Sequence, residues 1–241
     1  MEIICIASSS AGNAYLVKGS SSNMVIECGI PFRQLRTAIV KNGIIPSRIC
    51  VAAVSHGHGD HAVACEEMST WAPLFASAET LAGVKNRYTS RPRIAAKPWL
   101  PYQFGGFQIT AFPLDHDCEG TLGFIVREQD TDETLLFVND TRTVKWDFCQ
   151  YAFDYVMIEC NYVGEIMAAN ENADIVRRAS SHMSLEATKA VLAKLNREKT
   201  KWIWLMHLSD GNSDEACMIR EVEELTGVPT YACQKDGGVR R

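Results

Sequence analysis

The segment Ser55-His56-Gly57-His58-Gly59-Asp60-His61 contains three of the six histidines in this 241-residue chain. Its two glycines let the backbone fold tightly between the polar side chains. His56 and His58 alternate, so both can point to one position, whereas Asp60 and His61 open a helix and can face a second position. Two ligand sets this close together favour a two-metal centre over a surface histidine cluster with incidental metal affinity.

Strands are predicted to deliver further polar groups to the same place. Five short apolar runs are typical of strands covered on both faces. They cover residues 50–54, 109–114, 135–138, 155–158 and 202–206, and they lead into His56, His116, Asp140, Glu159 and His207. Ligands in layered α/β structures collect beyond the strand ends at one edge of the sheet. The sequence therefore predicts one site at a common edge.

The remaining periodicity predicts an N-terminal hairpin-like region, with strands at 3–7, 14–18 and 24–27, and helices at 31–42, 184–196 and 213–226. Pro31 is expected in the first turn of its helix, with Val40 among the residues near its apolar face. Ser184 and Ser213 are the expected N-caps of the other two helices, and Gly227 is expected to end the last one. Strands mixed with helices predict sheets flanked by helices.

Composition restricts the class of protein. The chain is 46% hydrophobic and 22% charged, which suits a large core. No linker or repeat divides residues 1–241, so a single domain is expected. Nine cysteines without a C-x-x-C pair indicate reduced thiols in a cytoplasmic protein rather than a disulfide scaffold or a zinc knuckle. No apolar run approaches the roughly 20 residues that span a bilayer, so no membrane partner is expected.

The pattern His56-x-His58-x-Asp60-His61 resembles the H-x-H-x-D-H signature of the metallo-β-lactamase superfamily. The family's other groups follow in order as Glu27, His116, Asp140 and His207. Finer features resemble the YycJ-like branch, namely the turn at 8–13, Glu159-Cys160-Asn161, His182-Met183-Ser184, and His207-Leu208-Ser209 with Asn212. The resemblance implies an α/β fold, the αββα sandwich of two mixed sheets flanked by helices. The activity that it implies is metal-dependent phosphodiester hydrolysis, as a nuclease or exonuclease on DNA.

The resemblance also implies a role for each residue of the pattern. One divalent ion is assigned to His56, His58 and His116. The second is assigned to Asp60, His61 and His207, and Asp140 bridges the two. An aspartate bridge resembles the phosphodiesterase side of the superfamily. Imidazole and carboxylate ligands suit Zn²⁺, Mn²⁺ or Fe, and zinc or manganese is expected here. Asp60 is also expected to orient the nucleophile or accept its proton.

Other candidates have alternatives that the sequence leaves open. His182 precedes a helix whose free N–H groups can hold a phosphate oxygen. It therefore either binds the scissile phosphate or protonates the leaving oxygen, or it has a structural or capping role. Ser184, Ser209 and Asn161 are the expected substrate-binding residues. Glu27 stands where the family has aspartate, and it either orients a ligand imidazole or is an ordinary acid at a strand end.

Charge bears on the substrate. Lys plus Arg is 24 and Asp plus Glu is 29, a formal charge of −5. This charge suits a strand end or a small substrate better than a long duplex, and the two ions would supply the local positive charge. Five arginines either form a basic rim around the site or lie on an ordinary solvated face: Arg87, Arg91, Arg93, Arg177 and Arg178. The pair Trp202 and Trp204 is expected in the core rather than in a base-stacking platform.

Several functions remain open at this level. The leading expectation is a phosphodiesterase acting on DNA ends or nucleotides, and a cyclic-nucleotide or other small-substrate phosphodiesterase is the alternative. A thioester hydrolase is less favoured, because the sequence has no sign of a site for an acyl-thiol. A non-catalytic metal-binding protein is opposed by the complete ligand set. The sequence does not specify the oligomeric state.

Overall fold

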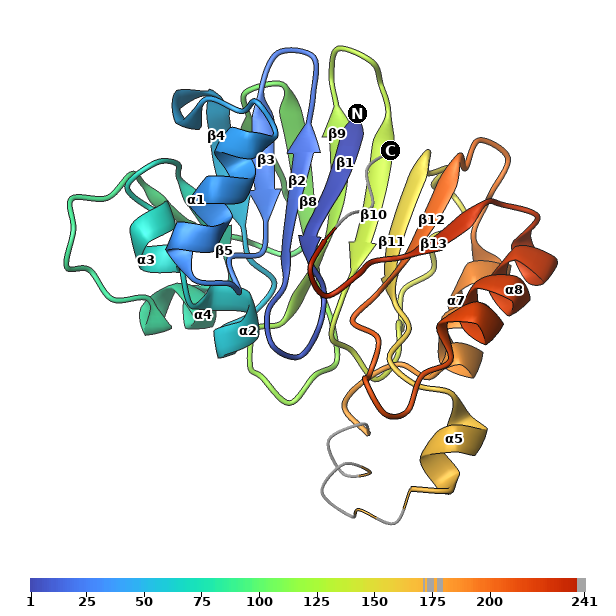
Figure 1. The fold of residues 1–241 in the computed structure, drawn as a ribbon. Helices are drawn as coiled ribbons and strands as arrows, with labels where there is room; N and C mark the ends of the chain where they lie inside the picture. The colour runs from blue at the N-terminus through green and yellow to red at the C-terminus, as the bar shows by residue number, and fades with distance from the viewer. Residues whose placement is uncertain (171, 173–175, 177–179, 238–241) are drawn as a thin grey trace.

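The computed structural model describes residues 1–170, 172, 176 and 180–237, and two β-sheets lie at the centre of this part of the chain (Figure 1). The first sheet contains, in spatial order, β1 (Glu2–Ala7), β2 (Ala14–Lys18), β3 (Asn23–Ile26), β4 (Ile49–Ala53), β5 (Leu74–Ala76) and β6 (Arg93–Ala95). Strands β1 to β3 pair antiparallel, whereas β3 to β6 pair parallel. The first sheet is therefore mixed, as predicted.

The second sheet is also mixed. It contains, in spatial order, β13 (Thr230–Ala232), β12 (Trp202–Met206), β11 (Tyr155–Glu159), β10 (Thr134–Val138), β9 (Leu122–Glu128), β8 (Phe107–Pro113) and β7 (Pro101–Phe104). Strands β10 to β13 pair parallel, and β9 is antiparallel to both of its neighbours. Strand β8 therefore runs in the same direction as β10, and both deliver their following loops to one edge.

Helices cover the two outer faces of the sheets. Figure 1 shows α1 (Phe32–Lys41), α2 (Gly59–Ala62), α3 (Cys65–Met68) and α4 (Ala78–Gly83) on the side of the first sheet. Helices α7 (Leu185–Lys194) and α8 (Glu215–Thr226) lie beside the second sheet, and α5 (Gly164–Ala168) lies near its edge. A 3₁₀ turn spans Pro46–Arg48. The arrangement confirms the αββα sandwich.

Three apolar clusters hold these layers together. The central one joins both sheets and includes Tyr15, Phe137 and Trp204, each at most 1% exposed. The second packs α1 and α3 against the first sheet, and the third packs α7 and α8 against the other. Trp202 is partly buried against the central cluster, so the prediction that the tryptophan pair belongs to the core is confirmed. This packing fixes the strand ends that carry the polar groups.

Two details of α1 differ from the prediction. Pro31 is the N-cap residue rather than a member of the first turn, with extended backbone at ψ 134. Leu35 and Ile39 are fully buried, but Val40 is 58% exposed. Successive helical residues lie about 100° apart, so Val40 turns out of the face that Ile39 occupies.

The N-cap of α8 also differs from the prediction. Asp214, not Ser213, accepts a hydrogen bond from the backbone N–H of Cys217 at 3.0 Å. The Ser213 hydroxyl instead donates to the carbonyl oxygen of Ser209 at 2.5 Å, so it is used by the preceding loop. The prediction that Gly227 ends this helix is confirmed, and its backbone is left-handed, with φ 69. No helix among the described residues is long and apolar enough to cross a membrane.

Candidate metal centre and active site

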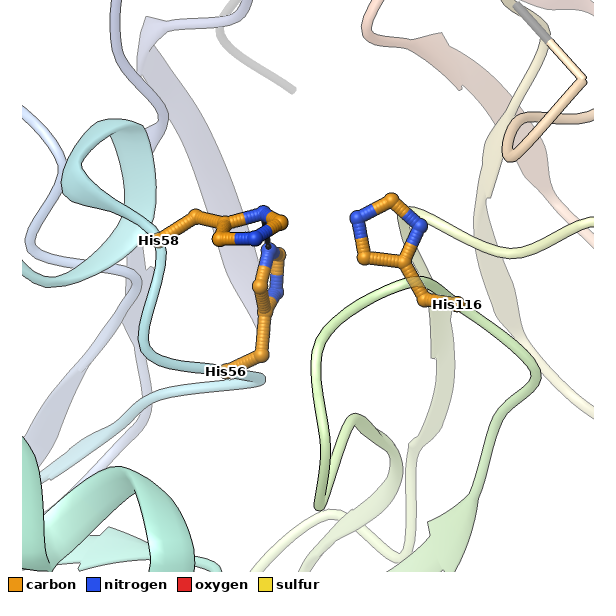
Figure 2. A group of neighbouring side chains, drawn as sticks. All are labelled: His56, His58 and His116. Atoms are coloured by element: carbon orange, nitrogen blue, oxygen red, sulfur yellow. Dashed lines mark hydrogen bonds between the residues drawn. The ribbon is translucent and has the colours of Figure 1, made fainter. Parts of the chain in front are cut away.

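Three imidazoles from two loops form the first cluster. Figure 2 shows His56 and His58, from the loop after β4, facing His116, from the loop after β8. Their ligand atoms all lie within 4.8 Å of one another. Nε2 of His56 lies 3.1 Å from Nδ1 of His58. Nδ1 of His116 lies 3.1 Å from the carbonyl oxygen of Ser181, to which it can donate, and this leaves Nε2 free to face the cluster.

A second cluster lies directly beside the first and consists of Asp60, His61, Asp140 and His207. Nε2 of His61 is 3.2 Å from Oδ2 of Asp140 and 3.5 Å from Oδ2 of Asp60. The same Oδ2 of Asp140 is 3.7 Å from Nε2 of His116 and 3.9 Å from Nε2 of His56. The Asp140 carboxylate therefore lies between the two clusters, where a group shared by two ions would have to be.

Three of the polar side chains at the site belong to residues with a left-handed backbone conformation. Glu27, Asp140 and His207 follow β3, β10 and β12, and their φ values are 65, 49 and 57. Non-glycine residues rarely adopt this left-handed conformation, which persists where the surroundings enforce it. At His207 the backbone N–H donates to the hydroxyl of buried Ser8 at 2.9 Å. The fold thus holds these residues in an unfavourable conformation at the site.

The N-terminal turn at 8–13 supports the histidine-rich loop. The backbone N–H of buried Asn13 donates to the carbonyl oxygen of Asp60 at 2.8 Å, and the N–H of Gly29 donates to the carbonyl oxygen of Asn13 at 2.9 Å. A Cβ on Gly29 would lie 1.6 Å from the carbonyl oxygen of Asp60, so only glycine fits there. The turn is therefore more than a hairpin loop, because it packs on the backbone between the predicted ligands.

Glu27 lies beside an imidazole of the second cluster. Its side chain is fully buried, and its Oε1 is 3.4 Å from Nδ1 of His61. Its Oε2 accepts a hydrogen bond from the backbone N–H of Ser55 at 3.3 Å. The acid thus lies beside the imidazole of one predicted metal ligand, and this position favours the orienting role over that of an ordinary strand-end acid.

Glu159 and His182 form a pair that sequence reasoning did not connect. Nδ1 of His182 is 2.5 Å from Oε1 of Glu159, which is fully buried. Oε2 of Glu159 accepts from the backbone N–H groups of Thr141 at 2.9 Å and Met183 at 3.3 Å. The sequence identified Glu159 as a polar group after a strand and as part of the feature Glu159-Cys160-Asn161. Nothing in its spacing indicated its partner, which lies 23 residues further along the chain.

The histidines of the centre differ in the direction in which their pKa values are shifted. Burial and the neighbouring imidazole of His61 lower the pKa of His56 to about 2. Burial also acts to lower the pKa of His207, but the carboxylates of Asp140, Asp60 and Glu159 outweigh it and raise this pKa to about 10. Burial opposes ionisation of Asp140 as well, yet the surrounding imidazoles hold its pKa well below the usual range. The carboxylates of the second cluster therefore favour a charged imidazole at His207, whereas the first cluster favours a neutral imidazole at His56.

His182 has a raised pKa. Burial acts to lower it, and the charge and hydrogen bond of Glu159 more than compensate. The pKa of Glu159 is lowered, because His182 offsets the effect of burial on the carboxylate. The pair therefore favours a protonated imidazole next to an ionised carboxylate.

The side chains present fit divalent metal ions. Two buried atoms at the centre, Nε2 of His207 and Oδ1 of Asp140, have no hydrogen-bond partner among the described residues. Buried polar atoms are rarely left without a partner, so their position indicates a ligand. Imidazole and carboxylate donors without thiolate suit Zn²⁺ or Mn²⁺. The fold thus offers two neighbouring groups suited to metal binding.

A pocket of about 400 Å³ opens over these groups. The candidate residues that line it are His58, Asp60, His116, Asp140, Asn161, His182, His207, Ser209 and Asn212. Asn161 is 5% exposed, and its amide donates to the carbonyl oxygen of His207 at 2.7 Å.

Other candidates lie elsewhere. Ser184 is not among the residues that line the pocket; its hydroxyl caps α7 by accepting from the backbone N–H of Ala187 at 3.2 Å, as its predicted N-cap role requires. Arg87 binds Glu66 at 2.6 Å, and Arg93 donates to the carbonyl oxygen of Val84 at 2.7 Å. Neither of these arginines nor Arg91 lines the pocket, and Arg177 and Arg178 lie outside the described residues.

Five lining residues, which include Ser181 and Gly211, were not among the candidates. Ser10 belongs to the N-terminal turn, Asp117 follows His116, and Asp210 lies in the loop before α8. Oδ1 of Asp117 is 3.0 Å from Nε2 of His116. Asp210 forms an ion pair with Lys235. No lysine or arginine from the described part of the chain lines the pocket, so its charged walls are acidic and imidazole groups.

Comparison with known proteins agrees with this architecture. A family model described as "Beta-lactamase superfamily domain" matches residues 22–208. The metallo-β-lactamase fold protein YhfI from Bacillus subtilis is 16% identical, with a TM-score of 0.76 over 100% of this chain and 98% of its own. Zn²⁺-bound PqqB from Methylobacterium extorquens is 13% identical, with a TM-score of 0.72 over 100% and 99% of the two chains.

The short form of human tRNase Z is also similar, at 13% identity and a TM-score of 0.67 over 100% of this chain and 98% of its own. A search of the curated proteins finds no match. At these identities the structural similarities show the fold alone. They do not distinguish the branches of the superfamily, so the YycJ-like branch stays a prediction.

Proposed function

The chain belongs to the β-lactamase superfamily, and from the geometry of its site we propose that it is a dinuclear metal-dependent phosphodiester hydrolase. The observation that carries the proposal is the position of Asp140, whose Oδ2 lies 3.2 Å from Nε2 of His61 in the second cluster and 3.7 Å from Nε2 of His116 in the first. His56, His58 and His116 would hold one ion, and Asp60, His61 and His207 the other. Zinc or manganese suits this donor set. When bound, two such ions would neutralise phosphate charge and activate water as a nucleophile.

Asp60 is proposed to orient the attacking water. Its side chain is partly exposed and lines the pocket, whereas the imidazole of His61 beside it is buried. Oδ2 of Asp60 lies 3.6 Å from Nε2 of His207. The carboxylate thus has one side against the metal cluster and the other toward the substrate, a position from which it can accept a proton.

His182 is proposed to protonate the leaving oxygen. It lines the pocket, and the charge and hydrogen bond of Glu159 raise its pKa, which favours the protonated imidazole. Glu159 fixes the ring by accepting from Nδ1, so Nε2 is the atom from which the proton would leave. Glu159 itself is fully buried and acts through His182, as a positioning residue. A general acid of this kind contributes about 10²–10⁴-fold to a rate.

The proposed substrate is a phosphodiester at the end of a DNA strand. The Ser209 hydroxyl on the pocket wall accepts from the Asn212 amide and can itself donate to a phosphate oxygen, with buried Asn161 beside it. One structural neighbour is named a tRNase, which supports a phosphodiester but says nothing about DNA. Ser184 caps its helix, so we assign it only an indirect role in shaping this wall.

One observation favours a small diester, such as a cyclic nucleotide, as the second candidate. The carboxylates of Asp117 and Asp210 are 53% and 70% exposed beside the pocket. They would repel further phosphates of a polyanion at that position.

Hydrolysis assays separate these functions. Purified protein is loaded with Zn²⁺ or Mn²⁺ and its metal content is measured. It is then given bis(p-nitrophenyl) phosphate, cyclic mononucleotides and end-labelled single-stranded DNA. The proposal expects about two equivalents of metal and metal-dependent cleavage of a diester. Well under one equivalent with no cleavage of any diester would contradict it and favour the non-catalytic metal-binding protein.

A further inference from the structure

A groove runs along the surface next to the proposed active site. One cavity of about 240 Å³ is lined by Pro113, Leu114, Asp115, Thr143, Lys145 and Trp146. A second, of about 90 Å³, shares Thr143 and Trp146 with it and continues against α7. Both begin at loops of the metal centre, since Asp115 directly precedes His116 and Thr143 follows Asp140 by three residues. The loops that carry His116 and Asp140 therefore contribute to both the metal centre and the groove.

Aromatic rings form part of this surface. Trp146 is 40% exposed, and its indole N–H donates to the carbonyl oxygen of Pro113 at 2.6 Å. Its ring contacts that of Trp99, itself 39% exposed, in a T-shaped arrangement with centroids 4.9 Å apart. Trp99 in turn stacks on Phe112. The hydrogen bond and the ring contact fix Trp146 while leaving a large part of its surface open, which suits a flat ligand.

Basic residues accompany the rings. Lys145 and Lys194 line the two cavities, and Arg142 lies on the same loop as Lys145. Nζ of Lys145 is 2.8 Å from Oδ2 of Asp115, and a guanidinium nitrogen of Arg142 is 3.7 Å from Oδ1. One carboxylate is thus shared by two cations, which leaves positive charge for an anion. The active-site pocket has no such cation among its described lining residues.

We propose that this groove binds the nucleotide next to the scissile phosphate in a single-stranded nucleic acid. The base stacks on Trp146, and the phosphate is held by Lys145 and Arg142. Exposed aromatic rings beside cations are how proteins bind single strands, because every base has a π-face and every nucleotide a charge. The inference rests on the proposed function and deepens it, since it selects a strand over a small cyclic substrate.

Binding measurements test the stacking directly. Fluorescein-labelled oligo(dT) and an abasic oligomer of the same length, both with hydrolysis-resistant phosphorothioate linkages, are titrated with the metal-loaded protein, and fluorescence anisotropy is recorded. Trp146→Ala is expected to raise the Kd for oligo(dT) about fivefold or more, and to change the Kd for the abasic oligomer much less. Lys145→Gln is expected to weaken both and to reduce the salt dependence of binding. The matched control is Tyr88→Ala, which removes an aromatic ring that is 48% exposed and lines neither cavity.

The outcomes separate this inference from the proposed function. Hydrolysis of bis(p-nitrophenyl) phosphate reports on the metal centre. If the wild-type protein hydrolyses it, but Trp146→Ala binds oligo(dT) as tightly as the wild type, the groove proposal is wrong and the proposed function stands. If Trp146→Ala removes base-dependent binding but the wild-type protein cleaves no diester, the groove proposal is supported and the proposed hydrolase activity is contradicted. If Trp146→Ala instead converts a dimer to a monomer in sedimentation and leaves oligo(dT) binding unchanged, the groove joins two copies of the chain and the proposal is overturned.

Discussion

Glu159→Gln should slow hydrolysis of DNA by about 10- to 150-fold. The carboxylate is fully buried and lies 2.5 Å from Nδ1 of His182. A hydrogen bond to a charged group is worth about 1.5–3 kcal/mol, and about 1.4 kcal/mol corresponds to a factor of ten. The loss is smaller than the roughly 10²–10⁴-fold expected for His182→Ala, because the weakened acid is still present.

The same substitution should change how kcat depends on pH. Glu159 raises the pKa of His182, so the acid stays protonated toward alkaline pH and activity falls as the pH rises through this pKa. Without the carboxylate charge, burial dominates and lowers the pKa. The alkaline limb of kcat should therefore move to lower pH in Glu159→Gln. The assay is the pH profile of kcat on an oligonucleotide, with metal content measured on the same samples.

The leaving group provides an independent check. The p-nitrophenolate anion leaves readily without a proton, so thymidine 5′-p-nitrophenyl phosphate should lose much less rate in this variant than DNA does. Glu186→Gln, which neutralises an exposed carboxylate on α7, is the control. Equal losses on both substrates, or an alkaline limb that stays in place, would refute the reasoning. The side-chain amide introduced by Glu159→Gln would also replace a carboxylate that accepts from two backbone N–H groups. The free energy of unfolding is therefore measured on the same variant, to detect a loss of stability.

Three other substitutions test the metal centre and the backbone that supports it. Asp140→Ala should abolish hydrolysis and lower the metal content measured by mass spectrometry, with circular dichroism unchanged; near-normal turnover would contradict its bridging role. Glu27→Gln should weaken metal retention about 10- to 100-fold in chelator competition, because His61 loses its charged neighbour. Gly29→Ala should lower Tm sharply, since its Cβ would strike a backbone carbonyl at 1.6 Å, whereas Gly59→Ala meets no atom within 4 Å and should have little effect.

The sequence predicted the fold class and the residues of the centre because both depend on local pattern. Apolar runs followed by His116, Asp140 and His207 mark strand ends, and the structure brings these residues beside the segment 56–61. Their roles as ligands stay predictions. Strand β9 was missed because no polar ligand follows it, although it sets the direction of β8 relative to β10. The cap of α8 was placed one residue early, because either Ser213 or Asp214 can start a helix.

Contacts between distant segments were decided only by the tertiary structure. The pairing of Glu159 with His182, the packing of Asn13 on the carbonyl of Asp60, and the hydrogen bond from Trp146 to Pro113 join residues between 23 and 47 positions apart. Such contacts leave no periodicity in the sequence, because they depend on how two sheets pack and not on the spacing of residues along one element. Spacing could therefore name the groups that would bind metal, and only the packed fold shows which side chains stand around them.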